Sequence, residues 1–124
     1  MIIIPDDEFA DLIAVALDEM PADHMKAVQN VAVVYADDPT PEQRVQLELR
    51  NDQTLFGLYE GVPLTARQGA INSYGPDKIT IFKNPITSSV HSIPELKDQI
   101  KRTVWHELAH YFGLNHAQIH KLEQ

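Results

Sequence analysis

The sequence contains no cysteine among its 124 residues. Disulfides, thiolate metal sites and thiol nucleophiles are therefore excluded, and histidine and carboxylates remain as the strong metal ligands. Positive charge is also scarce, because 10 basic residues stand against 18 acidic ones and the net charge is -8. A chain this acidic repels phosphate backbones, so we expect no nucleic-acid partner.

Long hydrophobic runs are missing as well. No uninterrupted apolar segment approaches the roughly 18 residues that span a bilayer. The apolar residues 1–4 run directly into an acidic segment and have no basic leader. We therefore expect a cytoplasmic protein with no membrane partner. With 44% hydrophobic residues the composition is that of a globular protein, and the length fits one domain over 1–124.

Hydrophobic periodicity divides the chain into short elements. Apolar residues at helical spacing predict a first helix over 7–19, and the Thr40-x-x-Gln43 pattern is a capping box that opens a second. β-Branched and alternating runs predict strands. The other expected elements are a buried strand over 31–35, a helix over 41–51, a strand or hairpin over 55–64, a strand over 78–83 and a short helix over 117–123.

The longest predicted helix begins at a second capping box, Ser92-x-x-Glu95. It ends at Gly113, where a left-handed residue would close it. His106 and His110 lie beside its apolar stripe, so groups there would sit at the edge of the core. The stripe consists of Ile93, Leu96, Ile100, Val104, Leu108 and Phe112.

This helix carries the pattern His106-Glu107-x-x-His110-x-x-Gly113-x-x-His116. His106 and His110 stand one turn apart, so both imidazoles can bind one tetrahedral Zn²⁺ ion. Gly113 lets the chain double back, so that His116 can reach the metal. Three protein ligands leave a fourth position for water, which is typical of a catalytic zinc site. We therefore expect one Zn²⁺ per chain.

Glu107 lies one residue further round the helix, where it can reach a zinc-bound water without being a ligand. Zinc lowers the pKa of that water towards about 7, and Glu107 would take its proton and pass it to the leaving amine. Zinc would also hold the developing oxyanion. The predicted function is zinc-dependent hydrolysis of peptide bonds, with Glu107 as the catalytic residue.

With this motif the chain resembles the zincins, and more closely the small bacterial zincin-like metallopeptidases, which are minimal metalloprotease-like domains. The resemblance covers most of the chain. It implies an α+β fold in which a small mixed β-sheet packs against helices, with the zinc motif on the long C-terminal helix. It also implies His106, His110 and His116 as zinc ligands and Glu107 as general base. The other similar segments are residues 9–21, 30–31, 57–64 with Arg67, and 78–82.

Two features depart from the patterns of these families. The third ligand position is often acidic in the small zincin-like family, so His116 makes this chain more similar to a metzincin. Metzincins, however, support their zinc with a methionine turn after the motif, whereas Met1, Met20 and Met25 all precede the helix here. The resemblance therefore does not carry over the full metzincin mechanism or its substrate subsites.

Several residues keep two interpretations. His120 could supplement or replace His116 at the metal, or be a solvated residue of the last helix. Arg67 and Tyr59 could bind a substrate carboxylate or an oxyanion, or form a salt bridge and a core contact. The resemblance implies that the strand over 78–83 could add a peptide at a sheet edge, and a plain core strand is the alternative. Substrate-binding residues stay unassigned, and Tyr111 and Trp105 are expected in the core.

The favoured function is therefore a zinc metallopeptidase that cleaves short peptides or flexible protein segments. The main alternative is a non-catalytic zinc-binding domain, a pseudo-peptidase used for partner binding or regulation, in which His120 is the fourth ligand. A second alternative is a regulatory protease that acts on one partner protein. The presence of Glu107 favours an enzyme, because a structural site needs no base.

Overall fold

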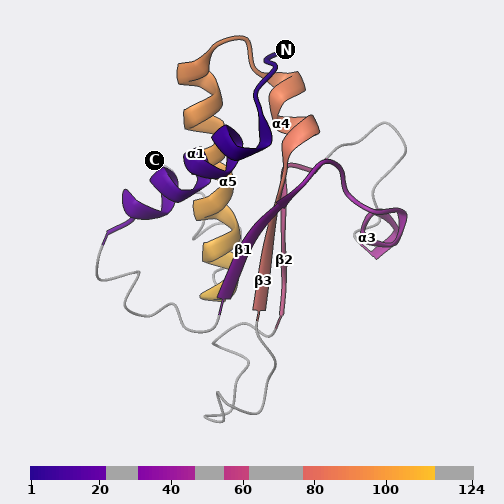
Figure 1. The fold of residues 1–124 in the computed structure, drawn as a ribbon. Helices are drawn as coiled ribbons and strands as arrows, with labels where there is room; N and C mark the ends of the chain where they lie inside the picture. The colour runs from indigo at the N-terminus through magenta and orange to yellow at the C-terminus, as the bar shows by residue number, and fades with distance from the viewer. Residues whose placement is uncertain (22–30, 47–54, 62–76, 114–124) are drawn as a thin grey trace.

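A computed structural model of the chain describes residues 1–21, 31–46, 55–61 and 77–113. These residues form an α+β fold, as predicted, in which the longest helix comes last (Figure 1). Among them, no helix is long and apolar enough to cross a membrane. The helices are α1 (Asp6–Asp18), α3 (Pro41–Gln46), α4 (Lys83–Ser89) and α5 (Ile93–Tyr111), and the strands are β1 (Val31–Ala36), β2 (Gly57–Glu60) and β3 (Asp77–Phe82).

The three strands form a small mixed sheet in the order β1-β3-β2. β1 runs parallel to β3, whereas β2 runs antiparallel to it with Tyr59 opposite Ile79. Helix α5 packs against β2 and β3, and α1 crosses α5 (Figure 1). The predicted mixed sheet packed against helices is thus confirmed.

The central position of β3 corrects two sequence predictions. β3 pairs with a neighbour along both edges, so of the two interpretations of the strand over 78–83 the addition of a peptide at a sheet edge is wrong and the core strand is confirmed. The predicted buried strand over 31–35 is instead β1, which is an edge strand among the described residues and in which Val34 and Tyr35 are 40% and 38% exposed. A β-branched run favours a strand, but its composition does not report how many neighbours that strand has.

The hydrophobic core lies between the sheet and the helices α1 and α5. The stripe of α5 is buried from Leu96 to Leu108, although Ile93 at its start is exposed. Burying such a set supplies the main favourable free energy of folding. The completely buried members of the core cluster are Phe9, Ile79, Ile81, Ile86, Leu96, Ile100 and Val104.

Both predicted capping boxes form, with one difference. The Thr40 hydroxyl accepts from the Gln43 amide at 3.0 Å, and the Gln43 side chain accepts from the Thr40 amide at 2.9 Å. The Ser92 hydroxyl accepts from the Glu95 amide at 3.2 Å, whereas the Glu95 carboxylate accepts from the His91 amide. Both boxes satisfy amides that have no partner within the helix.

Helix α4 was not predicted, because Pro85 and the short length of 7 residues hide its helical period. Proline is tolerated in the first turn of a helix, where the amides lack helical partners. The helix predicted over 41–51 is observed as α3 in the residues that the structure describes. The rest of that helix, the end of the segment 55–64 and the helix over 117–123 lie outside the described residues.

Candidate metal centre

The three residues of the His106-Glu107-His110 set come together on the last turns of α5. The Nε2 atoms of the two histidines are 3.2 Å apart, and both rings are half-buried. Two nitrogens bound at 2.0–2.1 Å to one tetrahedral zinc ion would be about 3.4 Å apart. One ligand atom from each of the three residues lies within 4.8 Å of the other two. The donor set therefore fits a zinc ion.

Glu107 differs from its two neighbours because it is buried, with 8% of its surface exposed. Burial raises the pKa of Glu107 from 4.5 to about 7, since the charged carboxylate loses hydration. Electrostatic attraction to His106 and a hydrogen bond from the Tyr59 backbone amide offset part of this rise. The Tyr59 amide thus stabilises the ionised form of Glu107.

The pairing of β2 explains why the Tyr59 amide is available to Glu107. The Phe82 amide donates to the Phe56 carbonyl at 2.8 Å, so these residues form a hydrogen-bonded pair. Hydrogen-bonded and non-hydrogen-bonded pairs alternate in an antiparallel ladder. Tyr59, three residues further along, is therefore in a non-hydrogen-bonded pair, and its amide points away from β3 towards α5.

Helix α5 lies unusually close to β2 at Gly57. A Cβ atom on Gly57 would be 2.7 Å from Cγ2 of Thr103 and 3.2 Å from Cγ of Glu107. Distances below 3.0 Å are essentially never seen for real Cβ atoms. In the sequence, Gly57 indicates only that a short strand or hairpin is interrupted there. In the structure, the absence of a side chain at Gly57 makes room for α5.

The Tyr59 side chain is directed into a packed contact. Its hydroxyl donates to Asp77 at 2.7 Å, and its ring makes an edge-to-face contact with Tyr111. This arrangement favours the core interpretation of Tyr59 over an oxyanion donor. Tyr111 is fully buried, as predicted, and Trp105 is partly buried and donates to the Ala16 carbonyl at 3.2 Å.

Helix α5 ends as the glycine predicts. Its last residue is Tyr111, Phe112 follows as the cap, and Gly113 has a φ of 81°. The Gly113 amide donates to the His110 carbonyl at 2.9 Å. This left-handed residue ends the helical conformation directly after the candidate metal centre.

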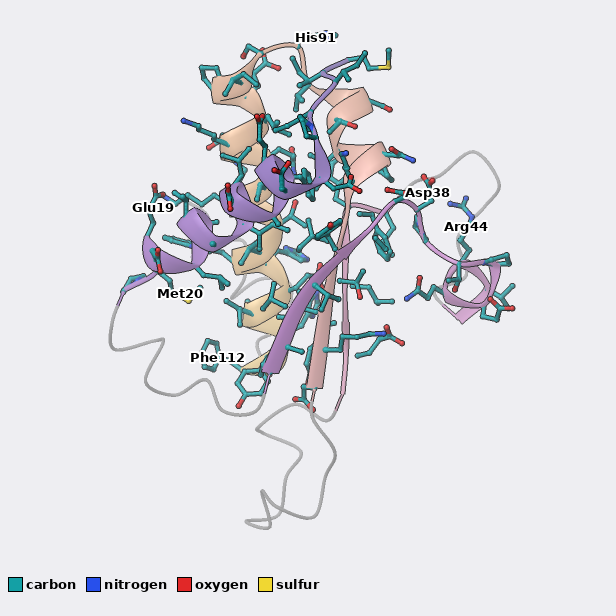
Figure 2. All side chains as sticks on the ribbon, in the orientation of Figure 1. Glu19, Met20, Asp38, Arg44, His91 and Phe112 are labelled. Atoms are coloured by element: carbon teal, nitrogen blue, oxygen red, sulfur yellow. The ribbon has the colours of Figure 1, made fainter. Side chains whose placement is uncertain are left out.

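The other candidate residues of the sequence fall in parts of the chain that the structure does not describe. His116, His120 and Arg67 lie outside the described residues. His91 is at the opposite end of α5 from Phe112 (Figure 2), and its Nδ1 atom is 3.4 Å from the amino group of Met1.

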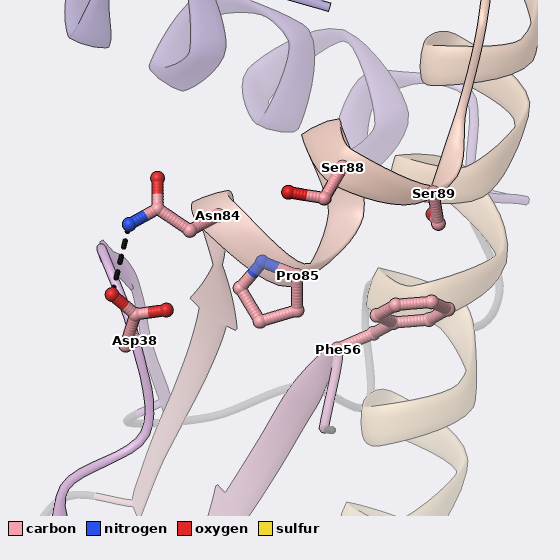
Figure 3. Close-up of a pocket in the computed structure, with 6 residues that line it drawn as sticks. All are labelled: Asp38, Phe56, Asn84, Pro85, Ser88 and Ser89. Atoms are coloured by element: carbon pink, nitrogen blue, oxygen red, sulfur yellow. Dashed lines mark hydrogen bonds between the residues drawn. The ribbon is translucent and has the colours of Figure 1, made fainter. Parts of the chain in front are cut away.

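A separate hollow of about 370 Å³ lies beside α4 (Figure 3). The Asn84 side chain donates to Asp38 at its rim, at a distance of 2.8 Å. None of the lining residues belongs to the His106-Glu107-His110 set, so the hollow is distinct from the candidate metal centre. The lining residues are Asp38, Phe56, Asn84, Pro85, Ser88 and Ser89.

Comparison with known proteins agrees with the motif. No curated protein matches the sequence. A conserved hypothetical protein from T. thermophilus has a similar structure, with a TM-score of 0.57 and 18% sequence identity over 88% of this chain and 94% of that one. This likeness extends to the fold alone. The sequence profile of zincin-like metallopeptidases matches residues 28–124, and the chain therefore belongs to the zincin-like metallopeptidase family.

Proposed function

We propose that this protein is a zinc-dependent peptidase that uses His106 and His110 as metal ligands and Glu107 as general base. The observation that carries the proposal is the 3.2 Å separation of the two Nε2 atoms beside a buried carboxylate. Zinc bound there would act as a Lewis acid that polarises the scissile carbonyl and acidifies water. The motif would bind one zinc ion per chain.

Glu107 would move the protons of the reaction. Its carboxylate is held by the Tyr59 amide and lies next to both histidines, so it can accept a proton from attacking water. The same carboxyl group would then deliver the proton to the leaving amine. General acid–base catalysis of this kind contributes typically 10²–10⁴-fold to a rate.

We assign the third ligand to His116, on the motif and on the turn at Gly113. The left-handed φ of 81° at Gly113 directs the chain off the helix three residues before His116. Replacing His116 with Ala should weaken zinc binding, whereas His120→Ala should leave it unchanged. The opposite result would make His120 the third ligand.

An extended peptide is the substrate class that the sheet favours. Within the described residues β2 is an edge strand, and the backbone amide of Tyr59 on its outer side contacts Glu107. A peptide lying in extended form beyond this edge would pass beside Glu107, while the Tyr59 amide stays bonded to the carboxylate. Short peptides and flexible protein segments can adopt that extended form without unfolding a domain.

Metal analysis and a peptide assay together test this proposal. We expect one zinc per chain in the wild type and in Glu107→Gln, and none in His106→Ala. Zinc-loaded wild type should cut unstructured peptides, and Glu107→Gln should be slower by about 10²–10⁴-fold. Wild-type protein that stays empty in the presence of zinc would refute the peptidase. Zinc-loaded protein that cuts no unstructured peptide would favour the two alternatives, a non-catalytic zinc-binding domain or a protease that acts on one partner protein.

A further inference from the structure

We propose that Gly57 is a positioning residue for Glu107. Because Gly57 has no side chain, α5 can lie against β2 closely enough for the Tyr59 amide to hold the Glu107 carboxylate. The inference rests on the proposed function, since it assumes that Glu107 is the base. It adds a residue that lies 50 positions earlier in the chain and belongs to a different element.

The neighbours of Gly57 cannot move aside easily. Thr103, whose Cγ2 atom would be 2.7 Å from a new Cβ, is buried. Its hydroxyl donates to the Gln99 carbonyl at 2.7 Å and accepts from the Gln99 side chain at 3.2 Å. Rotating Thr103 would break both hydrogen bonds. The third neighbour, 3.3 Å away, is the Thr80 carbonyl, a backbone atom of the central strand.

Relief of the contact at position 57 would move Glu107. A side chain at position 57 would also lie 3.2 Å from Cγ of Glu107, which is tighter than most real Cβ contacts. If α5 or the Glu107 side chain shifts away from β2, the hydrogen bond from Tyr59 lengthens or breaks. The carboxylate already has an oxygen within 4.8 Å of the histidine ligand atoms. A released carboxylate could therefore become a metal ligand, and the open position of a catalytic site would be lost.

Three variants separate this role from a general packing role. Thr103→Ser keeps the hydroxyl and removes Cγ2, so it serves as the matched control. In G57A/T103S the 2.7 Å clash is gone, while the contact with Glu107 remains. G57A alone should fold less stably than G57A/T103S.

Two readouts decide the proposal. In metal-free protein, the Tyr59 amide proton should move upfield in G57A/T103S relative to T103S, because its hydrogen bond to the carboxylate is lost. In zinc-loaded protein, G57A/T103S should retain one zinc per chain, and its kcat should be lower than that of T103S by about 10²-fold or more. A Tyr59 amide signal and a kcat equal to those of T103S would overturn the proposal.

A further variant keeps the test decisive if G57A/T103S does not fold. Replacing Glu107 with Ala removes the Cγ atom that faces position 57, so G57A/T103S/E107A should recover the stability of T103S/E107A. Failure to recover it would overturn the role of Gly57 towards Glu107. Should wild-type protein cut no peptide, the proposed function would fail, whereas the amide signal would still test the contact between Gly57, Tyr59 and Glu107.

Discussion

The Tyr59 hydroxyl donates a 2.7 Å hydrogen bond to Asp77, whose surface is 1% exposed. The two residues lie diagonally across β2 and β3, because Tyr59 is paired with Ile79 and side chains alternate along a strand. Gly61 makes room for this contact, since a Cβ atom there would overlap the Asp77 carboxylate. The hydrogen bond to Asp77 thereby fixes the Tyr59 side chain of β2, the strand whose Tyr59 amide contacts Glu107.

We expect Tyr59→Phe to destabilise the protein by about 1.5–3 kcal/mol, the usual range for a hydrogen bond to a charged group. Urea unfolding monitored by circular dichroism measures this change. Tyr35→Phe is the matched control, because Tyr35 is 38% exposed on the edge strand, and it should cost less than about 0.5 kcal/mol. Equal effects of the two substitutions would contradict a structural role for the Tyr59 hydroxyl.

Glu107 should make the stability of the metal-free protein depend on pH. Its folded-state pKa of about 7 exceeds the ordinary value of 4.5, so the folded state binds more protons than the unfolded state between these values. The contribution of Glu107 to stability therefore falls as pH rises through this window. Glu107→Gln removes the effect, so its stability relative to the wild type should rise by roughly 3 kcal/mol between pH 4.5 and 8.

Unfolding of both proteins in a chelating buffer at about pH 4.5 and about pH 8 measures this difference. Comparing the two proteins at each pH cancels the titration of the shared groups that do not interact with Glu107. A difference between wild type and Glu107→Gln that stays the same at both pH values would show that burial does not raise the pKa of Glu107.

Zinc should stabilise the folded protein through the two histidines of α5. At a free zinc concentration about 100 times the Kd, the free energy of unfolding rises by about 2.7 kcal/mol, because the ion binds only the folded state. For a chain of this size the Tm should rise by roughly 10 °C. Thermal unfolding with zinc and with a chelator provides the measurement.

His110→Ala should abolish this zinc-dependent rise in Tm. His91→Ala is the control, since His91 lies at the opposite end of α5 and outside the candidate metal centre (Figure 2). An undiminished rise in His110→Ala would place the zinc elsewhere.

The left-handed residue that ends α5 gives a further prediction. Gly113→Ala should lower the free energy of unfolding by about 1–2 kcal/mol, because an L side chain is strained at a φ of 81°. Gly113→Asn should lower it less, since asparagine tolerates this region better than alanine. Chemical denaturation of the zinc-free proteins tests the order. If alanine and asparagine are equally tolerated, residue 113 does not keep this φ in solution.

Local sequence signals predicted α5 and its ends well. The Ser92 box and Gly113 each act within a few residues and form as expected. The apolar stripe is buried from Leu96 to Leu108 but not at Ile93. The spacing of His106 and His110 likewise brings their rings to one face of the helix, because four residues complete about one turn. The third ligand, His116, stays a prediction, since it lies outside the described residues.

The tertiary structure alone decided the order of the strands and the surroundings of Glu107. The sequence of β3 is compatible with either an edge or a central strand, because pairing depends on residues far apart in the chain. Gly57 and Tyr59 likewise reach Glu107 only through a long-range contact, because β2 packs against α5. Local periodicity and capping determined the helix and its histidines, whereas long-range packing determined which backbone amide holds the carboxylate beside them.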